Sequence, residues 1–158
     1  MYEPPHPLYP YDKDHCSYKH KTAGYNYQVG ISPVEQKIFA IDGPFPAGSH
    51  NDKKIWNNSE LQQRLLEQNK RAITDGGYNG CAGVTTPNGR FDSKQTNLYK
   101  RRLHARHESF NARLKSFSIL SSTFRVKENR IGRHRTVMMA ICVIVATQMT
   151  TGSPLFEA

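Results

Sequence analysis

Acidic side chains are scarce in this sequence of 158 residues. Its 13 Asp and Glu stand against 22 Lys and Arg, which gives a formal charge of +9 with histidine neutral. A positive excess of this size favours a polyanionic partner, most often a nucleic acid or an anionic membrane surface. The length predicts one domain that buries a hydrophobic core of ordinary size.

Cysteine is equally scarce. The three cysteines, Cys16, Cys81 and Cys142, lie far apart in the sequence and form no CxxC pair. This spacing argues against a disulfide scaffold and against a zinc ribbon. We therefore expect reduced thiols in an intracellular compartment.

Long apolar runs and a targeting segment are also lacking. The longest apolar run, residues 137–146, has ten residues, whereas a membrane-spanning helix needs about 20. Residues 1–10 carry four prolines and no apolar stretch, so they do not resemble a secretory signal. The sequence predicts a soluble protein without a membrane partner.

The hydrophobic pattern predicts a mixed α/β domain that follows an extended segment. Residues 1–16 are rich in Pro, Tyr and His and form this extended segment, and residues 17–158 form the domain. Alternating apolar residues predict a strand at 25–32, which pairs as a hairpin with a second strand at 37–41. The Gly- and Pro-rich residues 43–48 are then expected to break regular structure.

Helices and short strands alternate in the rest of the chain. Helices are expected at residues 53–69, 96–116 and 134–150, and short strands at 72–74 and 81–87. Asp52 is the expected N-cap of the first helix. The last helix is apolar nearly all round, so we expect it to be the most buried element, with Cys142 in the core.

One carboxylate, Glu108, stands in a strongly basic stretch. Residues 93–127 contain nine Lys or Arg, and Glu108 is the only acid among them. On a helix, its neighbours three and four residues away include no Lys or Arg, so the usual intrahelical ion pair is missing. Such a residue can hold a divalent cation; the alternative is that it pairs with a distant arginine. The residues that share its helix face, and that would neutralise phosphates there, are Arg101, His104, Asn111 and Lys115.

Two further carboxylates are candidates for the same chemistry. Asp75 follows a buried strand, where open α/β sheets place ligand groups, although Asp before Gly is also a common turn former. Asp52 is explained fully by helix capping. The order of His104, His107 and Glu108 matches neither HExxH nor HxxEH. We therefore predict no zinc site, with His104 facing phosphate and His107 at the edge of the core.

Three segments, in this order and spacing, resemble the catalytic domain of Harbinger-like DDE transposases, also called DDE superfamily endonucleases. They are GPFPAGSHND at residues 43–52, ITDGGY at 73–78 and RHESFNARLKSF at 106–117. Shorter segments are also similar, namely YEP at 2–4, SYKHK at 17–21 and PLF at 154–156. The resemblance covers almost the whole chain.

The resemblance implies a ribonuclease-H-like fold, a mixed sheet with flanking helices, in which three acids hold two Mg²⁺ (or Mn²⁺) ions for chemistry on DNA phosphodiesters. By the resemblance, Asp75 matches the second acid, Glu108 the third, and Asp52 a supporting acid at the metal or DNA edge. The first acid of the family lies on the first central strand, just before the segment that resembles residues 2–4. We therefore expect that strand and its Asp to be missing, since Asp12 and Asp14 match the loop after it.

The sequence thus predicts a fragment of a DDE-type transposase or endonuclease that is inactive alone because the first catalytic Asp is missing. The alternatives are a non-catalytic DNA-binding or regulatory module derived from a transposase, and a fragment that never folds. DNA is the expected partner. The resemblance also implies a separate DNA-binding partner protein, because the sequence shows no helix-turn-helix or zinc module. The nucleus is favoured over the cytoplasm as the location.

Overall fold

The computed structural model describes residues 13–17, 22–35, 37–87, 89, 91–122, 130–152 and 154–155. The strands are β1 (Cys16–Ser17), β2 (Thr22–Ala23), β3 (Tyr25–Ile31), β4 (Ile38–Pro46), β5 (Ala72–Ile73) and β6 (Val84–Thr85). The helices are α1 (Asp52–Asn57), α2 (Glu60–Glu67), α3 (Lys94–Lys115) and α4 (Arg130–Thr151), with the short 3₁₀ helices η1 (Gly76–Tyr78) and η2 (Ser118–Leu120). The predicted α/β class is confirmed.

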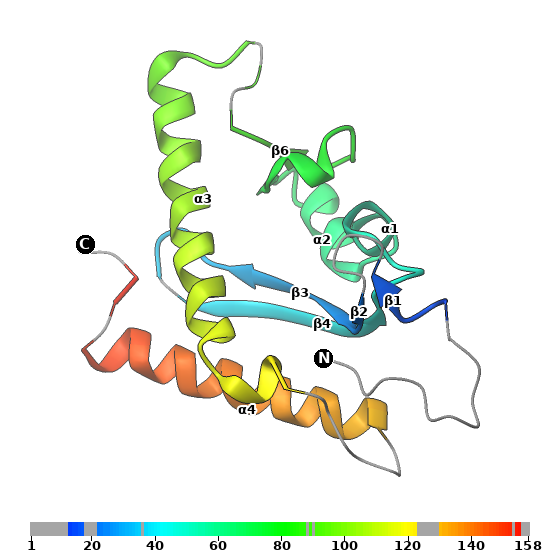
Figure 1. Cartoon of the computed structure of the whole chain (residues 1–158). Helices are drawn as coiled ribbons and strands as arrows, with labels where there is room; N and C mark the ends of the chain where they lie inside the picture. Colours follow the sequence, from blue (N-terminus) through cyan, green and yellow to red (C-terminus); the bar gives the residue numbers. More distant parts are fainter. Residues whose placement is uncertain are drawn as a thin grey trace.

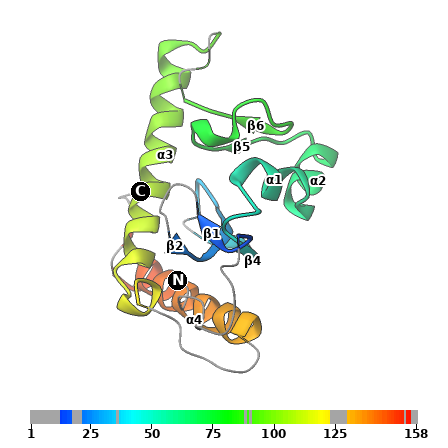
Figure 2. The same ribbon diagram turned by 45° about the vertical axis from the view of Figure 1, so that its right-hand side comes forward.

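The elements are arranged around the β3–β4 hairpin. Figures 1 and 2 both show α4 beneath this hairpin, α3 rising beside it, and α1, α2 and β6 on the side of the hairpin away from α4. The described strands pair only two by two, as β1–β2, β3–β4 and β5–β6. The first two pairs are antiparallel and the third is parallel. One continuous mixed sheet, as the resemblance implies, is therefore not formed by the described strands.

The hairpin is longer than the sequence predicts. β4 begins at Ile38 and continues to Pro46, which pairs with Tyr25. The prediction that residues 43–48 break regular structure is therefore wrong for most of that segment. A register shift between Asn26 and Gln28 lets the strand carry Gly and Pro, because the irregular ladder at a bulge needs fewer backbone donors.

The hydrophobic core lies between the hairpin and the two long helices. Its buried members come from α3 and α4: Phe110, Leu114, Met138, Ile141, Cys142, Val145 and Met149. Tyr27, Val29 and Ile31 of β3 pack against this cluster. The alternation that predicted a strand with one apolar face is confirmed, as is the prediction that Cys142 lies in the core.

Helix α4 is buried on one side only. Its outer residues remain exposed, with Val143 at 63%, Ile144 at 46% and Met139 at 41% of their surface accessible. The prediction that this helix is the most buried element is therefore wrong for its outer face. The hairpin and α3 cover one side of α4, while Met139, Val143 and Ile144 on its other side stay exposed.

The predicted helix at 53–69 is two helices. Asn51, not Asp52, is the N-cap of α1, because its side-chain oxygen accepts a hydrogen bond from Lys54 N at 2.9 Å. Ser59 caps α2 and accepts from Gln62 N at 3.1 Å. Two consecutive polar residues, Asn58 and Ser59, stand before Glu60. Their side chains form hydrogen bonds with the backbone, so that one helix ends and the next begins there. Asp52 is the first residue of α1, so the capping prediction for it is wrong.

The predicted extended segment at 1–16 lies mostly outside the described residues. Its end is a turn at 13–15, and Cys16 already belongs to β1. The Asp14 carbonyl accepts hydrogen bonds from Gly48 N at 2.8 Å and Ser49 N at 2.9 Å. A methyl group at Gly48 would collide with the carbonyls of this turn, so glycine is required where the two segments cross.

No helix of the described chain is long and apolar enough to cross a membrane.

A buried ion pair joins the start of α3 to the loop before it. Lys100 Nζ lies 2.7 Å from Asp92 Oδ2 and 2.9 Å from Oδ1, and both side chains are largely buried. Asp92 also accepts a hydrogen bond from Gly89 N at 3.0 Å. A lysine in the basic stretch is thus a structural residue.

We predict that Lys100→Ala lowers the free energy of unfolding by about 3 kcal/mol, because Asp92 then stays buried without its partner. The same change at the exposed Lys94 is expected to alter it by less than about 0.5 kcal/mol. Urea unfolding followed by circular dichroism measures both. Equal effects of the two variants would contradict the structural role of Lys100.

His134 is a buried histidine at the start of α4. Its Nδ1 lies 2.7 Å from the Tyr27 hydroxyl, and its ring stacks on Tyr27 and tilts against Tyr25. Only 5% of the residue is accessible. Burial lowers the pKa of His134 to about 4 and raises the pKa of Tyr27. His134 is therefore neutral in the folded protein near pH 7.

We predict that the protein loses stability as the pH falls from 6.5 toward 4, because the unfolded chain then takes up a proton that the folded chain refuses. The loss from this residue is about 2 kcal/mol between pH 7 and pH 5. Unfolding in urea at these two pH values measures it. His134→Gln keeps a polar group beside Tyr27 without titrating there, so it should remove this part of the pH dependence; an unchanged dependence would contradict the assignment.

Candidate functional site

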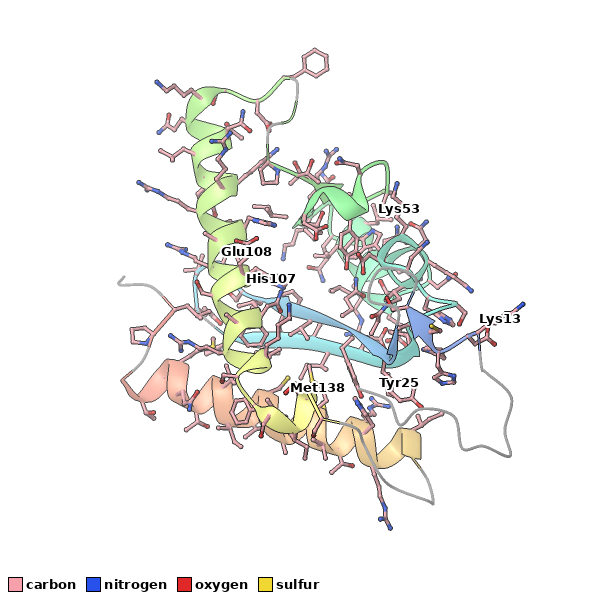
Figure 3. All side chains as sticks on the ribbon, in the orientation of Figure 1. Lys13, Tyr25, Lys53, His107, Glu108 and Met138 are labelled. Atoms are coloured by element: carbon pink, nitrogen blue, oxygen red, sulfur yellow. The ribbon has the colours of Figure 1, made fainter. Side chains whose placement is uncertain are left out.

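Glu108 lies in the middle of α3 with its side chain largely in solvent. Figure 3 shows it beside His107 on the helix, and 69% of its side chain is accessible. Its Oε1 lies 3.7 Å from His104 Nδ1, one turn earlier. Within the described residues this is its only ion pair, so the alternative of a distant arginine partner is wrong for them.

Asp75 follows β5 and caps the short helix η1. Its Oδ1 accepts a hydrogen bond from Gly77 N at 2.8 Å. The turn-forming role that the sequence left open for Asp75 is therefore confirmed. That role uses one oxygen of the carboxylate and holds the group exposed at the end of the strand, where it can also serve a ligand.

The carboxylates of Asp52 and Asp75 both approach Gly77. A methyl group added at Gly77 would sit 3.0 Å from Asp75 Oδ1 and 3.2 Å from Asp52 Oδ2. Helix α1 contacts η1, which brings the two carboxylates together from separate elements. The neighbouring Tyr78 responds to both: burial raises its pKa to about 12, and the charges of Asp52 and Asp75 add to the rise.

His107 links the Asp75 side of the site to Glu108. Burial lowers the pKa of His107, while the Val29 carbonyl and the carboxylates of Asp75 and Glu108 oppose that shift. Its Nε2 lies 3.4 Å from Val29 O, and its Nδ1 lies 3.2 Å from Asn111 Nδ2. His107 is half-buried at the edge of the core, as predicted. Two acids separated by more than thirty residues thus act on one imidazole.

The donor chemistry of this site fits a hard divalent cation, because carboxylate oxygens are the ligands that Mg²⁺ prefers. The pair formed by Asp52 and Asp75 suits one ion. Across the described residues, however, there is no group of three or more His, Cys, Asp or Glu side chains that could hold a metal. Glu108 therefore does not complete the pair, and a site for two ions is not assembled by these residues alone.

The face of α3 that carries Glu108 also carries the predicted phosphate-binding residues. Arg101 and Lys115 are exposed, and His104 and Asn111 are half-buried. On the adjacent face, Leu103, Phe110 and Leu114 are buried against the rest of the domain. Packing of that apolar face therefore turns the polar face outward.

Sequence reasoning missed Gly77 and Tyr78 at this site and Gln28 beside it. The sequence analysis treats Gly77 only as part of a glycine turn, although the carboxylates of Asp52 and Asp75 both approach it. Tyr78 had no signal in the sequence beyond its place after that turn.

Gln28 is buried on β3, although it alternates with the apolar residues that pack on the core. Its Oε1 and the Oγ1 of Thr74 are the buried side-chain atoms of the described chain that have no hydrogen-bond partner.

Carboxylates from α1 and from the end of β5 approach Gly77, and the outward face of α3 carries Glu108 among basic residues. The family model described as DDE superfamily endonuclease matches residues 4–146, and the chain belongs to this family. Comparisons with curated proteins and with solved structures give no match. Family membership supports a function of the transposase or endonuclease type, with DNA as substrate and divalent metals as the general cofactor of the family.

We predict that Gly77→Ala weakens binding of a lanthanide or Mn²⁺ ion by about tenfold, because a methyl group there separates the carboxylates of Asp52 and Asp75. Terbium emission sensitised by the neighbouring Tyr78 measures the affinity. Gly76→Ala is the matched control, because a methyl group at Gly76 meets nothing closer than Asn79 Nδ2 at 3.8 Å. Equal affinities of the two variants would contradict a cation site at Gly77.

Proposed function

We propose that the chain carries part of a Harbinger-like DDE catalytic centre, with Asp75 and Glu108 as its metal-binding acids and Asp52 as a supporting acid. One observation carries the proposal: a methyl group at Gly77 would lie 3.0 Å from Asp75 Oδ1 and 3.2 Å from Asp52 Oδ2, so both carboxylates approach this glycine. The pKa of His107 supports it, because the charges of Asp75 and Glu108 act against the lowering that burial causes.

The residues of the site divide into two roles. Asp52, Asp75 and Glu108 supply oxygen ligands, and bound divalent ions supply activation of the attacking oxygen and stabilisation of the leaving oxygen. The outward face of α3 binds the DNA backbone through phosphate contacts. The four residues of that face are Arg101, His104, Asn111 and Lys115. His104 Nδ1 lies 3.7 Å from Glu108 Oε1, which supports neighbouring roles for these two residues.

We further propose that the centre is incomplete, so that the chain alone is inactive or strongly impaired. In this family, two-metal chemistry also uses the first acid, which is carried on a strand between the hairpin and β5. Two observations support a place for such a strand. Among the described residues, β3 and β5 each pair with one strand only, and Gln28 Oε1 and Thr74 Oγ1 are buried without hydrogen-bond partners. Open strand edges of this kind also favour aggregation.

The second candidate function is a DNA-binding or regulatory module without chemistry. The formal charge of +9 and the exposed basic residues of α3 favour it, because they bind DNA whether or not the acids hold metal. A nuclear location and a separate DNA-binding partner protein accompany either proposal.

We predict that the purified chain binds duplex DNA and nicks supercoiled plasmid weakly or not at all with Mg²⁺ or Mn²⁺. The affinity should fall steeply with salt, and Arg101→Ala together with Lys115→Ala should weaken it and lower the salt slope by about two phosphate contacts. Lys37→Ala together with Lys70→Ala, on exposed residues outside α3, is the control with the same charge change. Fluorescence anisotropy and a plasmid relaxation assay measure the two properties.

The acid variants separate the two candidates. With a catalytic ancestry that still holds metal, Asp75→Ala and Glu108→Ala change the affinity for DNA when divalent metal is present; in a module without chemistry they leave it unchanged. Robust metal-dependent nicking that is abolished by Glu108→Ala would overturn the proposed impairment. Failure to bind DNA at low salt would overturn both candidates.

A further inference from the structure

The first turns of α3 carry a surface hollow that the proposed function does not use. Its volume is about 460 Å³, within the range of about 300–1,000 Å³ that is typical of small-molecule sites. The residues that line it are Gln95, Thr96, Leu98, Tyr99 and Arg102. Figures 1 and 2 show these turns at the end of α3 that is farther from α4. The hollow therefore lies apart from the hydrophobic core that α3 shares with α4.

The hollow faces away from Glu108. Tyr99 and Glu108 are nine residues apart in one helix, which is about 2.5 turns and about 14 Å along the axis. Their side chains therefore leave α3 on opposite sides. Arg102 follows Tyr99 by three residues and shares its side of the helix. This side is distinct from the face that carries Glu108 and the four proposed phosphate-binding residues.

Tyr99 stays at the surface for a structural reason. The inward position at this level of α3 is occupied by Lys100, which pairs with Asp92, and Tyr99 beside it is 53% exposed. Ser93 caps the helix by accepting a hydrogen bond from Thr96 N at 3.1 Å. The ion pair and the cap together fix the first turns of α3. A ring presented by a helix that is already ordered costs little further ordering when it binds a ligand.

The side chains of the hollow have the chemistry that recognises a nucleotide. The ring of Tyr99 offers a face on which a base can stack. The guanidinium group of Arg102 is exposed and can bind a phosphate oxygen. The amide of Gln95 has both a donor and an acceptor for the edge of a base. In a duplex each base is stacked between its neighbours, so only an unpaired base can present its face to Tyr99.

The charge around the hollow suits a polyanion. Residues 93–107 contain five Lys or Arg and no Asp or Glu. Such a stretch attracts a negatively charged partner, and family membership implies DNA as the substrate. An acidic peptide would match the charge alone; the exposed ring and the amide beside it favour a nucleotide.

We propose that this hollow binds an unpaired nucleotide of DNA, with the base stacked on Tyr99 and the phosphate bound by Arg102. The inference rests on DNA as the partner of this chain and does not depend on the metal ligands. Because the hollow and Glu108 lie on opposite sides of α3, a short single strand can occupy the hollow without reaching the acids.

Fluorescence anisotropy tests the proposal at low salt and without divalent metal. The probes are a labelled oligothymidylate of about ten nucleotides, within the usual range of single-strand site sizes, and a labelled duplex hairpin of the same length. Tyr99→Ala should weaken binding of the single strand by about tenfold, because a stacking contact is lost, and should change binding of the duplex by less than about twofold. Tyr99→Phe keeps the ring and should retain the affinity. Circular dichroism checks that the variants fold.

Phe39→Ala is the matched control, because it removes an aromatic ring of similar exposure, 56%, from β4. It should leave the affinity for both probes unaltered. Arg102→Ala should weaken binding of the single strand and lower its salt dependence by about one phosphate contact.

Four outcomes would overturn the proposal. They are an equal loss of duplex and single-strand affinity in Tyr99→Ala, no loss of either, a loss that Tyr99→Phe shares, and an equal effect of Phe39→Ala. A chain that binds the duplex but not the single strand would overturn this inference alone. A chain that binds neither probe would overturn it together with both candidate functions.

Discussion

The contact of α3 and α4 through one apolar cluster is the constraint on which the rest of the arrangement depends. Phe110 of α3 and Val145 of α4 are completely buried there, under the apolar face of the hairpin. This contact sets the rotation of α3 about its own axis. With Phe110 turned inward, Glu108 and its basic neighbours face outward, and His107 is left at the boundary beside the Val29 carbonyl. The core thereby positions the candidate site without supplying any of its ligands.

Because acidic residues are scarce in this chain, the few carboxylates of the candidate site stand out as possible metal ligands. The formal charge of +9 attracts phosphate to the chain as a whole, and Glu108 contacts His104 rather than a lysine or an arginine. Asp92 differs, because it is buried against Lys100 and serves stability. Helix α4 differs again, because residues 137–151 carry no charged side chain.

Local patterns predicted the elements better than their boundaries. The alternation at Tyr27, Val29 and Ile31 and the apolar stripe of α3 were confirmed, because each reports directly on burial. The predicted cap at Asp52 was wrong, since Asn51 and Asp52 are both good caps and the choice between them depends on which side chain reaches Lys54 N. The predicted burial of all of α4 was wrong because an apolar sequence does not say what is available to cover it.

The sequence by itself determined the class of the domain, the basic helix face around Glu108 and the resemblance carried by its three motifs, because these depend on residue identity and short spacing. Only the tertiary structure decided that the carboxylates of Asp52 and Asp75 both approach Gly77, that the charges of Asp75 and Glu108 act on the pKa of His107, and that one side of α4 stays exposed. These are distances between segments far apart along the chain, and they follow from how helices and strands pack rather than from any local preference.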